Sequence, residues 1–349
     1  MISLLIPTIN RPDFIMKYLQ FLELQGFQGE LLIGDSSTLD LFHETSSFIS
    51  KNNFCFKVLH KSYPHKMHFE VIQELLEFIQ YEFCMYICDD DFLLNSTLQK
   101  CVEFLNQNPD YTSAGGRALM LDVNDSWKIL SIRDYSLSSL EKSSPIDRLR
   151  ILANKYEVVA YSLSRTTDFI KRWPKSDDFF EKGIFIESHP CFSAAAQGKI
   201  KILEDLFVIR TNHERRILLP NFDDTIAGEF WESSVNYSIN ELTAIMKEQE
   251  KIPEEDIRNQ CSIIWQEHID MLKYSSLEKG PNSSYSRNSI DKLRSMIVKI
   301  IRIFFNNFQK KEIHHFLAEE HELDAYNSFV EVLSLGYNPE ILDKSNSSI

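Results

Sequence analysis

The segment Phe83-Cys84-Met85-Tyr86-Ile87-Cys88-Asp89-Asp90-Asp91-Phe92-Leu93-Leu94 carries the strongest structural signal in the chain. Its apolar part, residues 84–88, predicts a strand that is buried on both faces. The three aspartates that follow repel one another, and they are costly to bury unless a cation or hydrogen-bond donors lie among them. Because ligands bind at the carboxyl ends of strands in open α/β sheets, one interpretation is a site for a hard cation such as Mg²⁺ or Mn²⁺. The other is an acidic cap on a helix that begins near Asn95.

The composition is typical of a soluble globular protein and limits the classes of partner. The chain has 349 residues and a net charge of −14, which argues against a nucleic-acid partner. No apolar run approaches the roughly 18–20 residues of a membrane span, and residues 1–7 lack the pattern of a signal peptide. The six cysteines are scattered, as expected for reduced thiols. We therefore expect a cytoplasmic protein.

Strands and helices alternate along the first two thirds of the chain. Strands are predicted at residues 2–6, 30–34, 54–59, 83–88, 111–121, 158–164 and 200–209, with helices between most of them. This order is typical of an α/β fold with a mainly parallel, Rossmann-like sheet that is flanked by helices.

Helical patterns dominate from residue 230 onward. We therefore expect an α/β domain over residues 1–229 and a helical C-terminal region over 230–349. A stretch rich in Gly, Pro, Asn and Ser predicts a linker near 278–286 within that region.

Polar side chains follow three of the predicted strands, at Thr8–Arg11, Asp35–Ser37 and Asp89–Asp91. The carboxyl ends of parallel strands meet at one edge of a sheet, so these side chains should line one crevice. With a basic loop over residues 60–68 nearby, such a crevice would suit a nucleotide diphosphate that is held through a metal ion.

Several segments resemble motifs of the inverting, family-2-like GT-A glycosyltransferases. They are the first strand with its turn (5–12), the second strand with its base-contacting aspartate (32–37), the DxD motif (86–91), the acidic pair 186–187 placed 11 residues before Gly198, and the terminal strand with its histidine (200–213). The resemblance covers about residues 1–215. It implies a GT-A fold, a nucleotide-diphosphate sugar as donor, with a UDP-sugar favoured, and Mn²⁺ or Mg²⁺ as cofactor.

The resemblance also assigns metal ligands and donor contacts. Asp91 and His213 would bind the metal, which would neutralise charge on the departing diphosphate. Asp89 would hold the ribose or a metal-bound water, and Asp35 would accept a hydrogen bond from the base. The remaining donor-side residues are Pro7, Thr8, Asn10, Arg11, Lys66 and Asp90. Of the three carboxylates, Asp90 is the one we least expect to touch the metal.

Each assignment has a plain structural alternative. Asp35 could serve only its turn, Lys66 could belong to a solvated loop, and His213 could be an ordinary surface histidine beside Arg215 and Arg216.

Glu187 is the candidate general base that would deprotonate an acceptor hydroxyl. It stands where the family usually has the aspartate of a Glu-Asp pair. Its alternative role is to cap the helix that follows, and the rival bases on the preceding loop are Asp177, Asp178 and Glu181.

The segment 287–311 is strongly basic and has apolar residues at helical spacing. It carries seven basic side chains and one acidic side chain, Asp291. A basic amphipathic helix could lie on the inner face of an anionic membrane, which would suit a lipid-linked acceptor. The alternative is a helix that packs on its own domain or on a second copy of the chain.

The sequence thus predicts a metal-dependent glycosyltransferase that moves a sugar from a nucleotide-sugar donor to a hydroxyl of a glycan or lipid-linked acceptor. The resemblance adds inversion at the anomeric carbon and a role in bacterial surface polysaccharide synthesis. One alternative is a sugar nucleotidyltransferase, which would want a glycine-rich phosphate loop after the first strand, whereas Thr8–Pro12 has no glycine. The other is a non-catalytic nucleotide- or glycan-binding module, which would bind a nucleotide and never turn over a donor.

Overall fold

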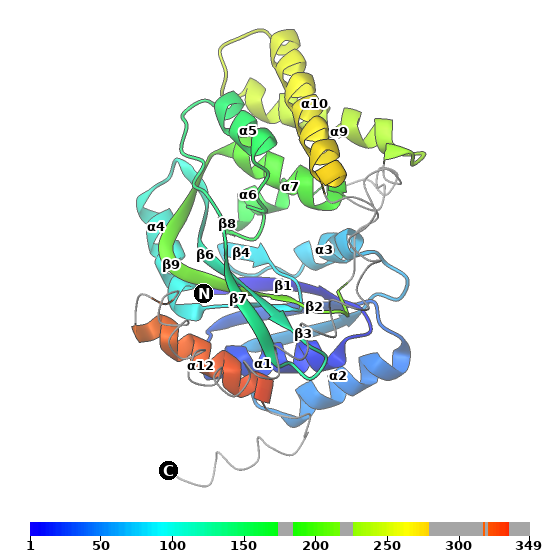
Figure 1. Cartoon of the computed structure of the whole chain (residues 1–349), viewed down its shortest axis with the longest axis vertical. Helices are drawn as coiled ribbons and strands as arrows, with labels where there is room; N and C mark the ends of the chain where they lie inside the picture. The colour runs from blue at the N-terminus through cyan, green and yellow to red at the C-terminus, as the bar shows by residue number, and fades with distance from the viewer. Residues whose placement is uncertain (174–183, 217–225, 279–316, 318–319, 335–349) are drawn as a thin grey trace, which may run out of the picture.

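The computed structural model describes residues 1–173, 184–216, 226–278, 317 and 320–334 (Figure 1). Three predicted features lie outside these residues: the rival bases on the loop before Glu187, almost all of the 278–286 linker, and the basic segment 287–311.

The described residues form a central nine-stranded sheet in the order β3-β2-β1-β4-β8-β6-β9-β5, with β7 paired to β6. Strands β1, β2, β3 and β4 are mutually parallel, and β6 is parallel to β9. The strands are β1 (Ile2–Thr8), β2 (Gly29–Asp35), β3 (Lys57–Ser62), β4 (Phe83–Tyr86), β5 (Asp91–Leu93), β6 (Tyr111–Val123), β7 (Ile129–Tyr135), β8 (Leu163–Arg165) and β9 (Lys199–Asn212). The prediction of an α/β fold with a mainly parallel sheet is confirmed.

Burial on both faces explains why the sequences of the first strands are runs of apolar residues. All residues of β1, β2 and β4 are buried, because helices cover both faces of this part of the sheet. Helix α3 (His68–Leu76) lies on one face against β1 and β2, and α1 (Pro12–Leu24) and α2 (Leu39–Lys51) lie on the other (Figure 1). The contact with α3 is close at Gly34, where a Cβ atom would approach the Val71 side chain to 2.2 Å.

A second group of helices packs together at the other end of the molecule. It contains α5 (Pro145–Asn154), α7 (Ile184–Gln197), α9 (Trp231–Lys247) and α10 (Glu254–Glu278) (Figure 1). Helices α4 (Asn95–Gln107) and α6 (Thr166–Ile170) pack nearer the sheet. The strand predicted at 158–164 is wrong in extent, since only Leu163–Arg165 pairs in the sheet.

Helix α12 (Glu320–Ser334) returns to the α/β part of the chain and packs on α1. Lys17 Nζ donates a hydrogen bond to the Val332 carbonyl at 3.1 Å. The ring of Phe329 lies 4.8 Å from that of Phe92 in β5. None of the helices within the described residues is both long enough and apolar enough to cross a membrane.

Candidate functional site

The parallel register brings the three polar strand ends to one edge of the sheet. Thr8 lies opposite Asp35, and Leu5 lies opposite Tyr86, three residues before Asp89. The Thr8 hydroxyl donates a hydrogen bond to Asp89 Oδ2 at 2.6 Å, so the first and fourth strands are joined at their ends. Pro7 pairs in register with Gly34 and is buried within β1.

The turns after β1 and β2 are held together by Asn10. Its φ is 54°, a left-handed conformation that asparagine tolerates better than most residues. The Asn10 N–H donates to Ser37 Oγ at 2.6 Å, and its Oδ1 accepts from the Thr38 N–H at 3.1 Å. This pair of bonds fixes the rim of the crevice next to Asp35.

Asp35 is buried, and the protein contacts both of its oxygens. Oδ1 accepts from the Ser37 N–H at 2.8 Å, and Oδ2 lies 3.0 Å from His60 Nε2. Ser46 Oγ lies 2.9 Å from the other ring nitrogen of His60. The carboxylate is therefore fixed in position at the carboxyl end of β2.

Asp89 is the most deeply buried member of the aspartate triplet. It is fully inaccessible to solvent and is paired with Arg11 and Thr8. Burial raises the pKa of Asp89 to about 7, although Arg11 opposes the shift. Asp89 thus stabilises the turn between β4 and β5 through its buried contacts with Thr8 and Arg11.

Asp90 and Asp91 have different cationic partners. Asp90 Oδ2 lies 3.1 Å from Arg11 and 3.1 Å from His213 Nε2. Burial acts to raise the pKa of Asp90, but the hydrogen bond from His213 and the Arg11 charge outweigh it and lower the pKa. Asp91 Oδ2 lies 3.1 Å from Arg210 Nε, and burial raises the pKa of Asp91 to about 6 against the effect of that arginine.

Arg210 is a site residue that the sequence reasoning missed. It lies opposite Asp91 in the antiparallel β5–β9 pair. Its guanidinium carbon lies 4.8 Å from the ring centroid of Tyr135 and 5.2 Å from that of Tyr161. An arginine directly after the apolar run Phe207-Val208-Ile209 was the available signal.

The donor set at this turn is suited to a divalent ion. Ligand atoms of Cys88, Asp90 and Asp91 all lie within 4.8 Å of one another. His213 adds an imidazole that contacts Asp90, and its Nδ1 is buried with no protein partner. The raised pKa values of Asp89 and Asp91 show that their negative charge is costly here, and a bound cation would favour the ionised form of Asp91. Carboxylate oxygens with an imidazole fit Mn²⁺ or Mg²⁺, and the group joins Asp90 with Asp91, whereas Asp89 lies outside it.

Glu187 lies in the first turn of helix α7, which begins at Ile184, and is half-buried. Burial raises its pKa, Arg210 and Arg216 act to lower it, and Asp91 acts to raise it further. These influences place Glu187 in the same electrostatic environment as Asp91 and Arg210.

The C-terminal helices hold the first turn of α7, which carries Glu187. Ser188 Oγ lies 3.1 Å from His268 Nε2 on α10. His189 Nδ1 lies 2.9 Å from Ser238 Oγ on α9. Helices α9 and α10 therefore fix the orientation of the candidate base.

Two side chains of the basic loop, Lys66 and His68, lie in different surroundings. Lys66 pairs with Glu74 on the surface, and both side chains are about 40% exposed. His68 lies instead beside Arg11 and Asp90, both of which influence its titration. Burial lowers the pKa of His68 to about 4, and its Nδ1 has no protein partner. A neutral imidazole therefore lies at the start of α3, with its ring centroid 5.9 Å from that of Tyr86.

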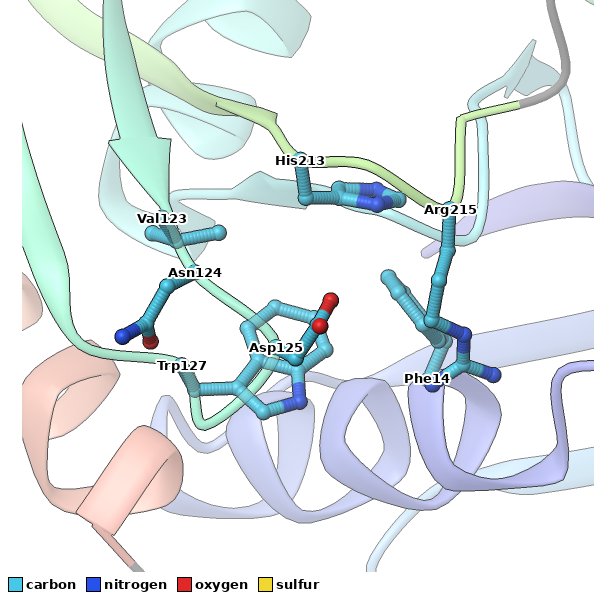
Figure 2. A pocket seen from close by; sticks show the side chains of 7 residues that line it. All are labelled: Phe14, Val123, Asn124, Asp125, Trp127, His213 and Arg215. Atoms are coloured by element: carbon cyan, nitrogen blue, oxygen red, sulfur yellow. The ribbon is translucent and has the colours of Figure 1, made fainter. Parts of the chain in front are cut away.

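A shallow hollow opens beside His213 (Figure 2). It contains about 210 Å³ of empty space, part of it open to solvent. Phe14 of α1 lines it, and the centroid of its ring lies 4.6 Å from that of Trp127 and 4.8 Å from that of His213. Trp127 lies in the β6–β7 connection with a φ of 58°, and Arg215 closes one side (Figure 2). The hollow thus joins the candidate metal ligand His213 to an aromatic surface.

Comparison with known proteins identifies the fold. No family model and no curated protein matches the sequence. The structure is similar to that of S. aureus TarS 1-349 in complex with UDP-GlcNAc, with a TM-score of 0.52 and 14% identity over 81% of this chain and 76% of that chain. It is also similar to the mannosyltransferase PcManGT from Pyrobaculum calidifontis in complex with GDP-Man and Mn²⁺, with a TM-score of 0.42 and 11% identity over 95% of this chain and 87% of that chain. The likeness to TarS 1-349 shows that the chain has a glycosyltransferase fold.

Proposed function

We propose that the chain is a metal-dependent, inverting glycosyltransferase of the family-2-like GT-A type. It moves a sugar from a nucleotide-diphosphate donor to an acceptor hydroxyl. The observation that carries the proposal is the turn at residues 88–91, where carboxylates and an imidazole gather at the carboxyl edge of a glycosyltransferase fold. We assign residues 1–229 to the catalytic domain and 230–349 to a helical region that supports it.

The donor would lie along the strand ends. Asp35 would receive the base, and the Thr8–Arg11 turn would line the nucleoside, with Asn10 fixing its shape. The diphosphate would lie near Asp90, Asp91 and His213, which would hold Mn²⁺ or Mg²⁺. When bound, the ion neutralises charge on the departing diphosphate. The UDP-GlcNAc of the TarS structure is the class of donor that we favour.

Glu187 would act as the general base. A carboxylate whose pKa is raised by burial is a stronger base near neutral pH than an exposed one. It would take the proton of the acceptor hydroxyl as the oxygen attacks the anomeric carbon and the bond to the diphosphate breaks. A single displacement of this kind inverts the configuration at that carbon.

The acceptor and location remain part of the proposal. A glycan or a lipid-linked acceptor, used in bacterial surface polysaccharide synthesis, would suit a cytoplasmic enzyme. Residues 287–311 would then contact the inner face of the membrane or a second copy of the chain, as their basic amphipathic pattern favours.

A thermal-shift screen of nucleoside diphosphates with Mn²⁺ or Mg²⁺ tests the donor site, because a ligand of the folded state stabilises it by mass action. We expect UDP to raise the melting temperature only when the metal is present. No stabilisation by any nucleotide with either metal would refute the proposal. Binding without release of nucleoside diphosphate from any nucleotide sugar would indicate the non-catalytic module, and formation of a nucleotide sugar from a sugar phosphate would indicate the nucleotidyltransferase.

A further inference from the structure

Cys88 lies where it can act on the metal itself. The N–H of Asp91 donates to the Cys88 carbonyl at 3.2 Å, so the chain turns back on itself between these residues. The turn brings Cys88 Sγ within 4.8 Å of ligand atoms on both Asp90 and Asp91. Three ligands at about 2.2 Å from one ion are about 3–4 Å apart, and three atoms that are 4.8 Å apart lie about 2.8 Å from their common centre. Side-chain movements of about half an ångström each would therefore close the three groups around one ion.

Two further contacts surround this group. His213 is 4% exposed at its side chain, and its Nε2 contacts the Asp90 carboxylate. On the other side, the Tyr161 hydroxyl lies 3.0 Å from Cys88 Sγ and can donate a hydrogen bond to a thiolate. An ion at this turn would thus meet one sulfur and two oxygen donors from one short segment, with His213 beside the Asp90 carboxylate.

The buried Cys84 offers an internal comparison. It lies in β4, four residues before Cys88. Burial raises the pKa of both thiols, so the pKa does not distinguish them. Within the part of the chain that the structure describes, Cys84 belongs to no group of potential metal ligands. The position of Cys88 on the turn, and not its presence near a strand end, makes it a candidate ligand.

We propose that Cys88 is a ligand of the divalent ion at the Asp90–Asp91 turn and makes the site prefer softer ions to Mg²⁺. Mg²⁺ takes oxygen ligands, whereas thiolate favours later first-row ions such as Co²⁺ and Zn²⁺, with Mn²⁺ between them. The S–H bond is exchanged for a bond from sulfur to the metal, one proton is released to solvent, and no atom changes its oxidation state. This inference rests on the metal site of the proposed function.

Co²⁺ titration of the full chain, followed by absorption in the near ultraviolet, tests the ligand directly. The parent for this experiment carries Cys55→Ser, because Cys55 is an exposed thiol that could bind Co²⁺ on its own. We expect a thiolate-to-cobalt charge-transfer band that saturates with one site. Adding Cys88→Ser or Cys88→Ala should abolish the band and lower the affinity for Co²⁺ by about tenfold or more relative to that for Mg²⁺. Adding Cys84→Ser should leave both unchanged.

The outcomes separate this inference from the proposed function. Co²⁺ binding without a charge-transfer band, or a band that survives in the Cys88 variants, would overturn the role of Cys88 and leave the metal-dependent transferase intact. Failure of Co²⁺, Mn²⁺ and Mg²⁺ to bind at all would overturn both. Circular dichroism of each variant shows whether a lost band reflects a lost ligand or a lost fold, and agreement between the Ser and Ala variants supports the former.

Discussion

The buried charge of Asp89 should make the stability of the chain depend on pH, and Asp89→Asn isolates that effect. Burial raises the pKa of Asp89 to about 7 from an ordinary value of 3.8, although Arg11 and Thr8 favour the charged form. Between these pH values the folded chain keeps a proton that the unfolded chain has released, so acidification stabilises the fold. This stabilisation is complete below the ordinary value and is lost as the pH rises through 7.

The magnitude follows from the interval between the two pKa values. Ionisation of Asp89 lowers the free energy of unfolding by about 4 kcal/mol in total, and about 2 kcal/mol of this loss falls between about pH 5 and about pH 7. Asparagine cannot ionise and therefore carries no such cost. The free energy of unfolding of Asp89→Asn, relative to that of the parent chain, should rise by about 2 kcal/mol over this range.

Urea unfolding followed by tryptophan fluorescence, with EDTA present, measures this difference at several pH values. Burial also shifts the pKa of other groups, and it lowers that of His189 and His268 to about 4. Their effects on stability cancel in the difference, because both chains contain these histidines. Asp110→Asn is the matched control. Asp110 is exposed, and its pair with Lys199 lowers its pKa. Asp110 is therefore ionised in both the folded and the unfolded chain above about pH 5, and its contribution to the free energy of unfolding should stay constant from there to about pH 7. A flat difference for Asp89→Asn, or one of opposite sign, would contradict the effect of the buried charge.

Three further variants test the site. Asp91→Asn should abolish Mn²⁺-dependent nucleotide binding, measured by calorimetry with and without EDTA, and unchanged affinity in Mn²⁺ would remove Asp91 from the metal site. Glu187→Gln should preserve donor affinity and reduce the rate of sugar transfer by about 10²–10⁴-fold. In the parent chain, the transfer rate should rise with pH, with an apparent pKa above the 4.5 of an ordinary glutamate. Near-normal turnover of the variant would show that another residue is the base. His68→Ala should weaken the binding of a nucleoside diphosphate. Lys66→Ala should not, because Lys66 pairs with Glu74 on the surface. A binding titration in which Lys66→Ala loses more affinity than His68→Ala would return Lys66 to the site.

Local patterns were sufficient to predict the frame of the site. The apolar runs of β1 and β2 and the start of α1 at Pro12 follow from burial and proline geometry within each segment. The meeting of Thr8 with Asp89 follows from parallel topology alone. The predicted strand at 83–88 was too long, because β4 ends at Tyr86 and Asp91 starts a new strand. That new strand depends on pairing with Arg210, 119 residues away, which no local pattern contains.

Long-range packing also explains which site residues were missed. Arg210 looks like the end of an apolar strand until Tyr135 and Tyr161 come to lie against it from distant segments. Lys66 was chosen for its charge, but the loop directs that side chain to Glu74 and turns His68 inward. Charge and residue type pointed to this loop, but only the path of its backbone decides which of its side chains are buried.

The packing of α12 on α1 has a consequence for how the protein is made. The ring of Phe329 rests on Phe92, the residue after Asp91, and Glu322 accepts a hydrogen bond from the Leu206 N–H at 2.5 Å. While the chain is still on the ribosome, Phe92 can already pack on Tyr18 and Phe21 of α1, but it lacks the cover of Phe329 until residue 334 has emerged. At typical translation speeds, the time between the synthesis of β5 and the synthesis of residue 334 is on the order of ten seconds or more. During this interval we expect the nascent chain to expose an aromatic surface that suits a chaperone, next to the turn that we propose as the metal site.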